Sequence, residues 1–401
     1  MRYIYYFIGG LAVLAGLFFV LNQNNDLVEI SNSDNLASAN VEEKNPNSDI
    51  ASQKPLENPP SEIKAVYFTG WSGGSEDKID YLINLARKTE INAVVLDVKD
   101  YSGYITYDID IPLTKKYNSK EVKIAKINSL IKRLHDEEIY VIARISVFQD
   151  PVLAKARPDL AIISSSTGKI WLDNKKLAWI DPAAKEAWDY NIAIAKDAQN
   201  RGFDELNFDY IRFASDGNLS DMKFPFWDEV KLKRYVMKDF FKYLRESLPD
   251  AKLSADLFGM ATVAKDFGVG QTMEDAFPYF DFIAPMVYPS HYARGFNGYQ
   301  NPALYPYEII KYSMESALQR LTSYEKELVE KTASSTNPGL NINIPKFRPW
   351  LQDFDLGAEY TAEMVRAQIR ASYDVLGSKS GGFMLWNPSN IYTIEALNPK
   401  L

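Results

Sequence analysis

Short apolar runs alternate with longer amphipathic stretches from about residue 63 to the end of the chain. The apolar runs are rich in Val, Ile and aromatic residues, which predicts β-strands. In most of the intervening stretches, apolar residues recur every three or four positions, which predicts helices with one buried face. The expected strands are 63–70, 93–98, 140–148, 205–211, 252–258, 280–288, 345–354 and 382–387. The expected helices are 76–89, 120–138, 183–201, 228–248, 306–330 and 361–376.

Eight such strands separated by helices predict an α/β fold of the (β/α)₈ TIM-barrel type. An open, doubly wound sheet is the alternative. Against it, the glycine-rich turn at 70–74 lacks both the dinucleotide fingerprint spacing and a P-loop lysine. Two long excursions, 99–119 and 150–182, follow the second and third expected strands. They leave from the carboxyl ends of strands, where loops build the active sites of barrels.

The first residues have a different character. Residues 3–21 are apolar and uncharged, with Arg2 before them and Asp26 and Glu29 after them. This pattern predicts a single transmembrane anchor at 1–22 that places the rest of the chain outside the cytoplasm. Residues 23–62 are rich in Asn, Ser, Asp, Glu and Pro and are expected to form a disordered linker before the barrel at 63–401. Cleavage of the first segment as a signal peptide, with secretion of the barrel, is the alternative.

Composition excludes several classes of function. The formal net charge of -8 disfavours a nucleic-acid partner, because phosphate binding needs a basic surface. The chain has no cysteine, so it cannot form disulfides or thiolate metal sites. The only histidines are His135, expected to be solvated on a helix, and His291. A multi-histidine metal centre is therefore excluded, and neither a metal nor another cofactor is expected.

Two neighbouring strands each carry an aspartate that is expected to point into the barrel. Alternation along 205–211 turns Asn207 and Asp209 inward, and it assigns the helix-facing side to Leu206, Phe208 and Tyr210. In 252–258 the same reasoning turns Ser254 and Asp256 inward. An inward carboxylate is costly unless it is hydrogen-bonded or used in chemistry. The alternatives are a salt bridge from Asp209 to Arg144 or Arg212, and a purely orienting role for Asp256.

Further polar and aromatic residues lie near the ends of the expected strands. Asp97 lies at the end of the second strand and could act as the acid in place of Asp256, bind a sugar hydroxyl or fix a loop. Asp150 and Asp181 each precede a proline and are expected to cap helices. The expected substrate-binding residues are Tyr67, Asp100, Arg144, Arg212, Tyr288, His291, Trp350, Gln352 and Trp386.

Several of these segments resemble one family. The segments Tyr67-Phe68-Thr69-Gly70-Trp71, Val95-Leu96-Asp97-Val98-Lys99-Asp100, Ala143-Arg144-Ile145-Ser146, Asn207-Phe208-Asp209-Tyr210-Ile211-Arg212-Phe213 and Pro349-Trp350-Leu351-Gln352-Asp353-Phe354 resemble the bacterial glycosyl hydrolase domain of the DUF4015 type. The resemblance implies a barrel related to α-amylases and α-galactosidases, in which an aspartate ending the fourth strand, here Asp209, is the nucleophile. Amylase-like barrels take their acid from a Glu ending strand five, where this chain has Asp256. Galactosidase-like barrels use an Asp ending strand six, where this chain has Tyr288.

Together these observations lead to two hypotheses. The first is a glycoside hydrolase that acts on an extracellular or cell-envelope polysaccharide or oligosaccharide through Asp209 and Asp256, with Asp97 as the alternative acid. The second is a barrel that binds carbohydrate at the cell surface without cleaving it. A calcium site built from oxygen ligands has less support, because no aspartate-rich loop with regular spacing is present.

Overall fold

The computed structural model describes residues 48–265, 267–333 and 343–400. The predicted anchor and most of the predicted linker lie outside the described residues. In the part of the chain that is described, none of the helices combines the length and the apolar character needed to cross a bilayer.

Eight parallel strands of the described chain form a closed ring. Each strand pairs with the next, and the last strand pairs with the first, so the sheet closes as a (β/α)₈ barrel. A two-residue strand, β11 (Lys346–Phe347), pairs with the start of the sixth barrel strand. In ring order the strands are β1 (Ile63–Phe68), β2 (Ala93–Lys99), β5 (Tyr140–Ser146), β7 (Glu205–Asp209), β9 (Leu253–Phe258), β10 (Phe282–Met286), β12 (Trp350–Gln352) and β13 (Gly382–Trp386). All eight expected strands are confirmed.

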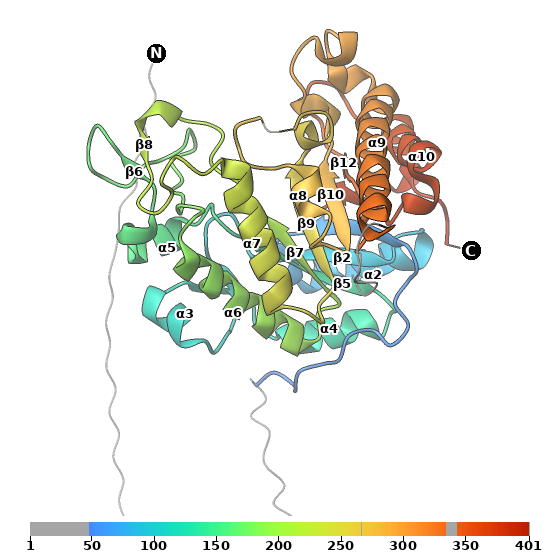
Figure 1. The fold of residues 1–401 in the computed structure, drawn as a ribbon. Coiled ribbons are helices and arrows are strands. Elements are labelled where there is room, and N and C mark those ends of the chain that lie inside the picture. The colour runs from blue at the N-terminus through green and yellow to red at the C-terminus, as the bar shows by residue number, and fades with distance from the viewer. Residues whose placement is uncertain (1–47, 266, 334–342, 401) are drawn as a thin grey trace, which may run out of the picture. The chain divides into compact units, whose positions relative to one another are not determined.

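Helices cover the outside of the ring. The helix α6 packs against β5 and β7, and α9 and α10 pack against each other (Figure 1). Five of the six expected helices are confirmed with small shifts of their ends. The main helices are α2 (Glu76–Lys88), α4 (Ile127–His135), α6 (Lys185–Arg201), α7 (Lys233–Ser247), α9 (Pro306–Ala333) and α10 (Ala362–Leu376). The short ones are α1 (Gly70–Gly73), α3 (Pro112–Tyr117), α5 (Pro151–Ala156) and α8 (Met273–Ala276).

The sixth expected helix, 120–138, is wrong in its first part. Residues Lys120–Ile124 form the strand β4, and only Ile127–His135 are helical. β4 pairs with β3 (Ile105–Tyr107), which in turn pairs antiparallel with β2. The first excursion therefore supplies β3 as the partner of β4. The spacing of apolar residues within 120–138 contains no information about this partner.

Alternation along the strands places the side chains as predicted. Leu206, Phe208 and Leu253 pack in the large core between the ring and the helices. Asn207 points into the barrel, where its side-chain amide donates to Asp256 at 2.9 Å. The interior also holds a smaller apolar cluster that includes Tyr67. Polar residues of β7 and β9 thus share the barrel interior with aromatic rings.

Residues 48–61, which composition assigns to a disordered linker, contact the base of the barrel instead. Asp49 accepts hydrogen bonds from the backbone N–H groups of Asn128 at 2.7 Å and Ser129 at 3.0 Å, in the first turn of α4. The N–H of Leu56 donates to Asp204 at 2.6 Å. The segment is held by hydrogen bonds to helix and loop ends rather than by a large apolar core, so its polar composition does not reveal the contact.

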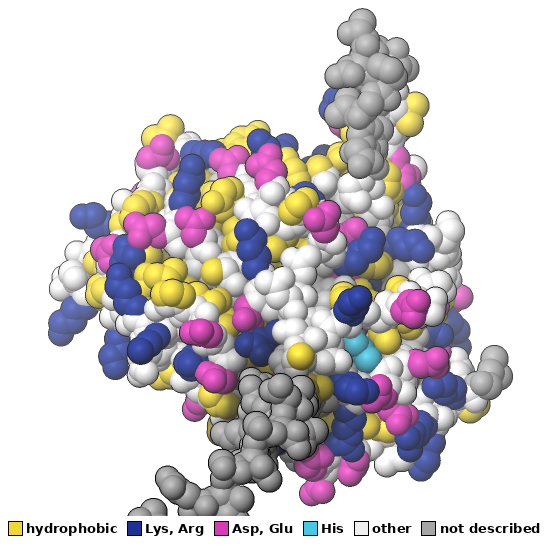
Figure 2. Space-filling model, turned by 90° about the horizontal axis from the view of Figure 1, so that it is seen from below, with side chains coloured by type: hydrophobic (Ala, Val, Ile, Leu, Met, Phe, Trp, Pro, Cys, Tyr) yellow, Lys and Arg dark blue, Asp and Glu magenta, His cyan; other side chains and the backbone are white. Residues whose placement is uncertain are grey.

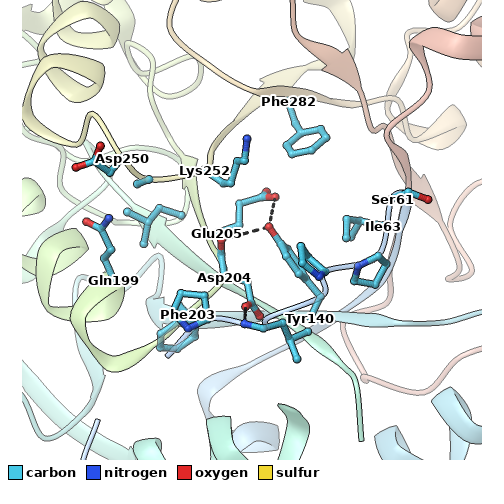
Figure 3. A pocket seen from close by; sticks show the side chains of 16 residues that line it. Ser61, Ile63, Tyr140, Gln199, Phe203, Asp204, Glu205, Asp250, Lys252 and Phe282 are labelled. Carbon is cyan, nitrogen blue, oxygen red and sulfur yellow. Dashed lines mark hydrogen bonds between the residues drawn. The ribbon is translucent and has the colours of Figure 1, made fainter. Parts of the chain in front are cut away.

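A cavity of about 300 Å³ lies between this segment and the amino-terminal ends of the barrel strands (Figure 3). Tyr140 and Glu205, the first residues of β5 and β7, line it and hydrogen-bond to each other at 3.4 Å. Next to them, Arg348 donates to both oxygens of Glu205, at 2.7 and 2.8 Å, with both side chains fully buried. Figure 2 views the molecule from this side, where basic and acidic side chains intermingle. Active sites of barrels form at the opposite end.

Candidate active site

A cleft of about 440 Å³ opens at the carboxyl ends of the barrel strands. It brings together several residues expected from the sequence with others that were not. The expected ones are Arg144, Asp209, Tyr288, His291 and Trp386. The remaining lining residues are Lys175, Tyr210, Phe258, Gly259, Met260, Met286 and Tyr292.

Arg144 of β5 contacts three aspartates from three other strands. Its Nη1 lies 2.6 Å from Asp97 of β2, and its Nη2 lies 2.5 Å from Asp209 of β7. Its Nε lies 3.7 Å from Asp256 of β9. All four side chains are buried, and Asp209 is 5% exposed where it meets the cleft. Of the two salt bridges considered for Asp209, the one to Arg144 forms.

Asp209 is held from two sides. One carboxylate oxygen faces Arg144, and the other accepts a hydrogen bond from the backbone N–H of Tyr210 at 2.5 Å. β7 ends at Asp209, and Tyr210 adopts a left-handed backbone conformation with φ of 53°. The strand alternation therefore ends at Asp209 and does not extend to Tyr210. The side chain of Tyr210, which was predicted to face the helices, also lines the cleft.

Asp256 lies beside Asp209 but deeper in the barrel, and it is 1% exposed. Its Oδ1 accepts hydrogen bonds from the indole of Trp350 at 2.8 Å and from the amide of Asn207 at 2.9 Å. Burial, and then the negative charge of Asp209, raise the pKa of Asp256 to about 8, against the opposing effect of Arg144. At neutral pH this carboxyl group therefore holds a proton.

Asp97 completes the network on the other side of Arg144. Its second oxygen accepts from the hydroxyl of Tyr67 at 2.6 Å. Burial raises the pKa of Asp97, and the positive charge of Arg144 acts in the opposite direction. The ring of Tyr67 stacks on Trp386 with centroids 3.8 Å apart, and the guanidinium carbon of Arg144 lies 5.2 Å from the Trp386 ring. The two rings and Asp97 together fix the position of Arg144.

This geometry agrees with the comparisons to known proteins. Residues 65–392 match the DUF4015 family, which is described as a putative glycosyl hydrolase domain. The chain belongs to this family. The match confirms the resemblance inferred from the motifs, and no curated protein matches the sequence.

Solved structures with a similar fold include glycoside hydrolase domains. The DUF4015 barrel is 16% identical to the glycoside hydrolase domain of PgaB (BpsB) from Bordetella bronchiseptica, with a TM-score of 0.56 over 85% of this chain and 100% of that one. A hypothetical protein from Ruminiclostridium thermocellum ATCC 27405 is 41% identical, with 48% of this chain and 96% of that one covered and a TM-score of 0.45. The α-galactosidase TtGalA from Thermus thermophilus is 11% identical, with 85% and 65% covered and a TM-score of 0.48. The PgaB match supports the barrel fold.

Five expected substrate-binding residues of the DUF4015 barrel do not line the cleft. Tyr67 is buried, stacks on Trp386 and donates its hydroxyl to Asp97. Asp100 forms an ion pair with Lys123 at 2.7 Å in the first excursion. The guanidinium of Arg212 packs on the ring of Phe258 at 4.3 Å. Trp350 is fully buried beneath Asp256, and Gln352, also fully buried, accepts a hydrogen bond from the backbone of Ser290 at 3.1 Å. Burial gives these side chains structural contacts in place of solvent-facing ones.

Of three other polar residues, His135 and Asp181 differ in part from expectation and Asp150 does not. His135 is half-buried, and its Nε2 lies 3.0 Å from Asp204, so it is not simply solvated. Asp150 caps α5 as predicted, through the N–H of Leu153 at 2.7 Å. Asp181 accepts from the N–H of Ala183 at 2.9 Å, but the helix α6 begins only at Lys185.

The sequence reasoning missed Lys175 and the apolar residues Phe258, Met260 and Met286 of the cleft. Lys175 lies in the excursion at 150–182, which was expected at this end of the barrel. No sequence motif around Lys175 distinguishes it from the other residues of the excursion. Within the described ranges, His, Asp and Glu side chains form no group of three arranged to hold a metal ion. The three aspartates of the site surround a guanidinium.

Proposed function

We propose that the barrel hydrolyses glycosidic bonds, with Asp209 and Asp256 as its catalytic residues. One observation carries the proposal: two aspartates at the ends of neighbouring strands contact one guanidinium, yet their environments differ. Asp209 faces the cleft and pairs with Arg144, whereas Asp256 is buried and keeps its proton at neutral pH. Two neighbouring carboxyl groups in different environments can divide the roles of base or nucleophile and acid.

The roles follow from these environments. Glycosidic cleavage passes through an oxocarbenium-like transition state, so Asp209 acts as nucleophile or stabilises the positive charge, and Asp256 protonates the leaving oxygen. Asn207 and Phe208 of β7 pair with Ser254 and Ala255 of β9, so Asp209 and Asp256 follow in register on neighbouring strands. Asp97 is the weaker candidate for the acid, because both of its oxygens are engaged by Tyr67 and Arg144.

The walls of the cleft fit a sugar. Trp386, Tyr288 and Phe258 present aromatic rings, and Met260 and Met286 add apolar surface. Such rings pack against the apolar faces of pyranoses while polar groups bind the hydroxyls. The substrate that we propose is an extracellular or cell-envelope polysaccharide or oligosaccharide.

A direct test uses the full-length chain in a mild detergent and a panel of polysaccharides, with release of reducing ends as the measurement. The wild type should release product from at least one polymer. Asp209→Asn should lower kcat by about 10³-fold or more, as expected when a transition-state charge loses its partner. Asp216→Asn is the matched control, because this aspartate follows the same strand but does not line the cleft. Full activity of Asp209→Asn would rule out its proposed role.

A glycan-binding barrel without hydrolysis is the second candidate. It is favoured by the fact that Asp209 is the only carboxylate among the described residues that line the cleft, since Asp256 is buried behind it. For this function, wild type and Asp209→Asn would both bind a glycan, measured by calorimetry, and neither would release reducing ends.

We also propose that residues 3–21 hold the barrel on the outer side of the cell membrane. The support is their uncharged apolar sequence and the charges that flank it. Fractionation of cells and the N-terminal sequence of the mature protein test this proposal. A mature chain that starts after residue 22 and appears in the medium would replace the anchor with a cleaved signal peptide.

A further inference from the structure

Lys175 sits at the tip of a turn whose backbone is fixed by a buried carboxylate. One oxygen of Asp173 accepts from the backbone N–H groups of Lys175 and Leu177, each at 2.9 Å. The other oxygen accepts from the indole of Trp179 at 3.0 Å. Asp173 is 3% exposed. The turn is therefore a rigid support, and it presents the Lys175 side chain to the cleft.

The charge of Lys175 is not matched within the protein. Arg144, the other cation that lines the cleft, has aspartates on three sides. Among the described residues, the ammonium group of Lys175 forms no ion pair and no side-chain hydrogen bond. The Lys175 side chain is exposed and lines the cleft, so its ammonium group is available to an anionic ligand, and a charge-assisted hydrogen bond there adds specificity.

His291 reaches the cleft from the short helical turn that follows β10. Partial burial, and then the positive charge of Lys175, lower the pKa of His291. Its Nδ1 hydrogen-bonds with the hydroxyl of Ser290 at 3.0 Å, which orients the ring. A neutral imidazole therefore lies within electrostatic reach of the ammonium group. With His291 neutral and Arg144 paired with aspartates, Lys175 supplies the positive charge of the cleft that remains for a ligand.

We propose that Lys175 binds an anionic substituent of the substrate sugar, so that the barrel acts on acidic glycans. The inference rests on the proposed function of the cleft and adds the substrate class to it. In this arrangement Arg144 is paired with the aspartates, and Lys175 binds the negative charge of the sugar. A sugar carboxylate, sulfate or phosphate would supply the matching anion.

The test compares each acidic polymer with its own uncharged form. Alginate and polygalacturonate are paired with their carboxyl-reduced products, dextran sulfate with dextran, and a phosphate-bearing glycan with its dephosphorylated form. Binding to the full-length Asp209→Asn chain is measured by calorimetry, and hydrolysis by the wild type is measured in parallel. At least one acidic member should bind about tenfold more tightly than its uncharged form, and the pair that shows this identifies the anion.

Lys175→Gln should remove this preference, raising KM for the acidic polymer about tenfold with little change in kcat, and Lys175→Arg should restore most of it. Lys176→Gln is the matched control, since its neighbouring side chain is exposed and does not line the cleft. Equal binding of every acidic and uncharged pair, no binding at all, or a preference that survives in Lys175→Gln would overturn the proposal. Selective binding without hydrolysis would support it while refuting the hydrolase.

Discussion

The indole N–H of Trp350 donates to Oδ1 of Asp256 at 2.8 Å across the inside of the barrel. A hydrogen bond to the charged form of a carboxyl group lowers its pKa, whereas burial and a neighbouring negative charge raise it. For Asp256 the raising effects win and bring the pKa to about 8. The proton on Asp256 is thus controlled by identifiable neighbours, and this leads to several measurable consequences.

The activity should fall as the pH rises through about 8. Asp256 must carry its proton to act as the acid, and it loses the proton above its pKa. The measurement is the pH profile of kcat/KM for the full-length chain from about pH 5 to 10. Asp256→Asn should lower kcat by about 10²–10⁴-fold and should remove this alkaline limb. An alkaline limb near pH 8 that persists in Asp256→Asn would assign it to another group.

Trp350→Phe should shift the same limb to higher pH. The substitution keeps an aromatic ring but removes the hydrogen bond to Asp256, so the pKa of the carboxyl group rises, by about one unit. Trp188→Phe is the matched control, because the indole of Trp188, on α6, donates to the backbone carbonyl of Pro182, away from the cleft. An unchanged or lowered limb in Trp350→Phe would contradict the role of the indole.

Asp256→Asn should become more stable relative to the wild type as the pH rises. The pKa of Asp256 is about 8 in the folded protein against an ordinary value of 3.8, so its favourable contribution is complete below 3.8 and is lost as the pH rises through about 8. The difference in unfolding free energy between variant and wild type should grow with pH, with an upper limit of about 1.4 kcal/mol per pH unit. Urea unfolding at about pH 5 and 8 measures it, with Asp216→Asn as the control.

The buried pair at the base of the barrel should affect stability and not activity. Glu205→Gln leaves the fully buried Arg348 without its charge partner and should lower the unfolding free energy by about 3–5 kcal/mol. The double variant Glu205→Leu with Arg348→Met should recover most of this loss, because it removes both charges. Hydrolysis by the folded fraction should not change, since the pair lies at the end opposite the cleft. A double variant less stable than Glu205→Gln would contradict this account.

The sequence predicts the strands well because each barrel strand is an apolar run bounded by polar residues. The prediction fails at 120–124. The partner strand β3 lies more than ten residues earlier in the chain, and the spacing of apolar residues within 120–138 is typical of a helix. For the site, alternation along β7 and β9 correctly turned Asp209 and Asp256 inward. It could not distinguish Arg144 from Arg212, because Arg212 lies beyond the end of its strand, where alternation no longer applies.

Other features of the site arise only from packing. The burial that raises the pKa of Asp256 depends on Trp350, which comes from β12 and is separated from the strand of Asp256 by β10. Trp350 and Gln352 were expected to contact the substrate because they lie near the carboxyl end of a barrel strand. Their position in the sequence does not show that both side chains are buried. Lys175 reaches the cleft through a turn fixed by Asp173, and no spacing rule connects it to the barrel strands.

The contacts of Arg144 also constrain the order in which the protein can assemble. Its partners Asp97 and Asp209 are 47 and 65 positions away along the chain, and each belongs to a different strand. Contacts between distant positions form only after long loops have closed, which makes them slow steps in folding. A fragment that lacks one of these strands lacks a partner of Arg144 and cannot form the complete network. Recovery of the proposed glycan binding during refolding would therefore report when this side of the barrel closes.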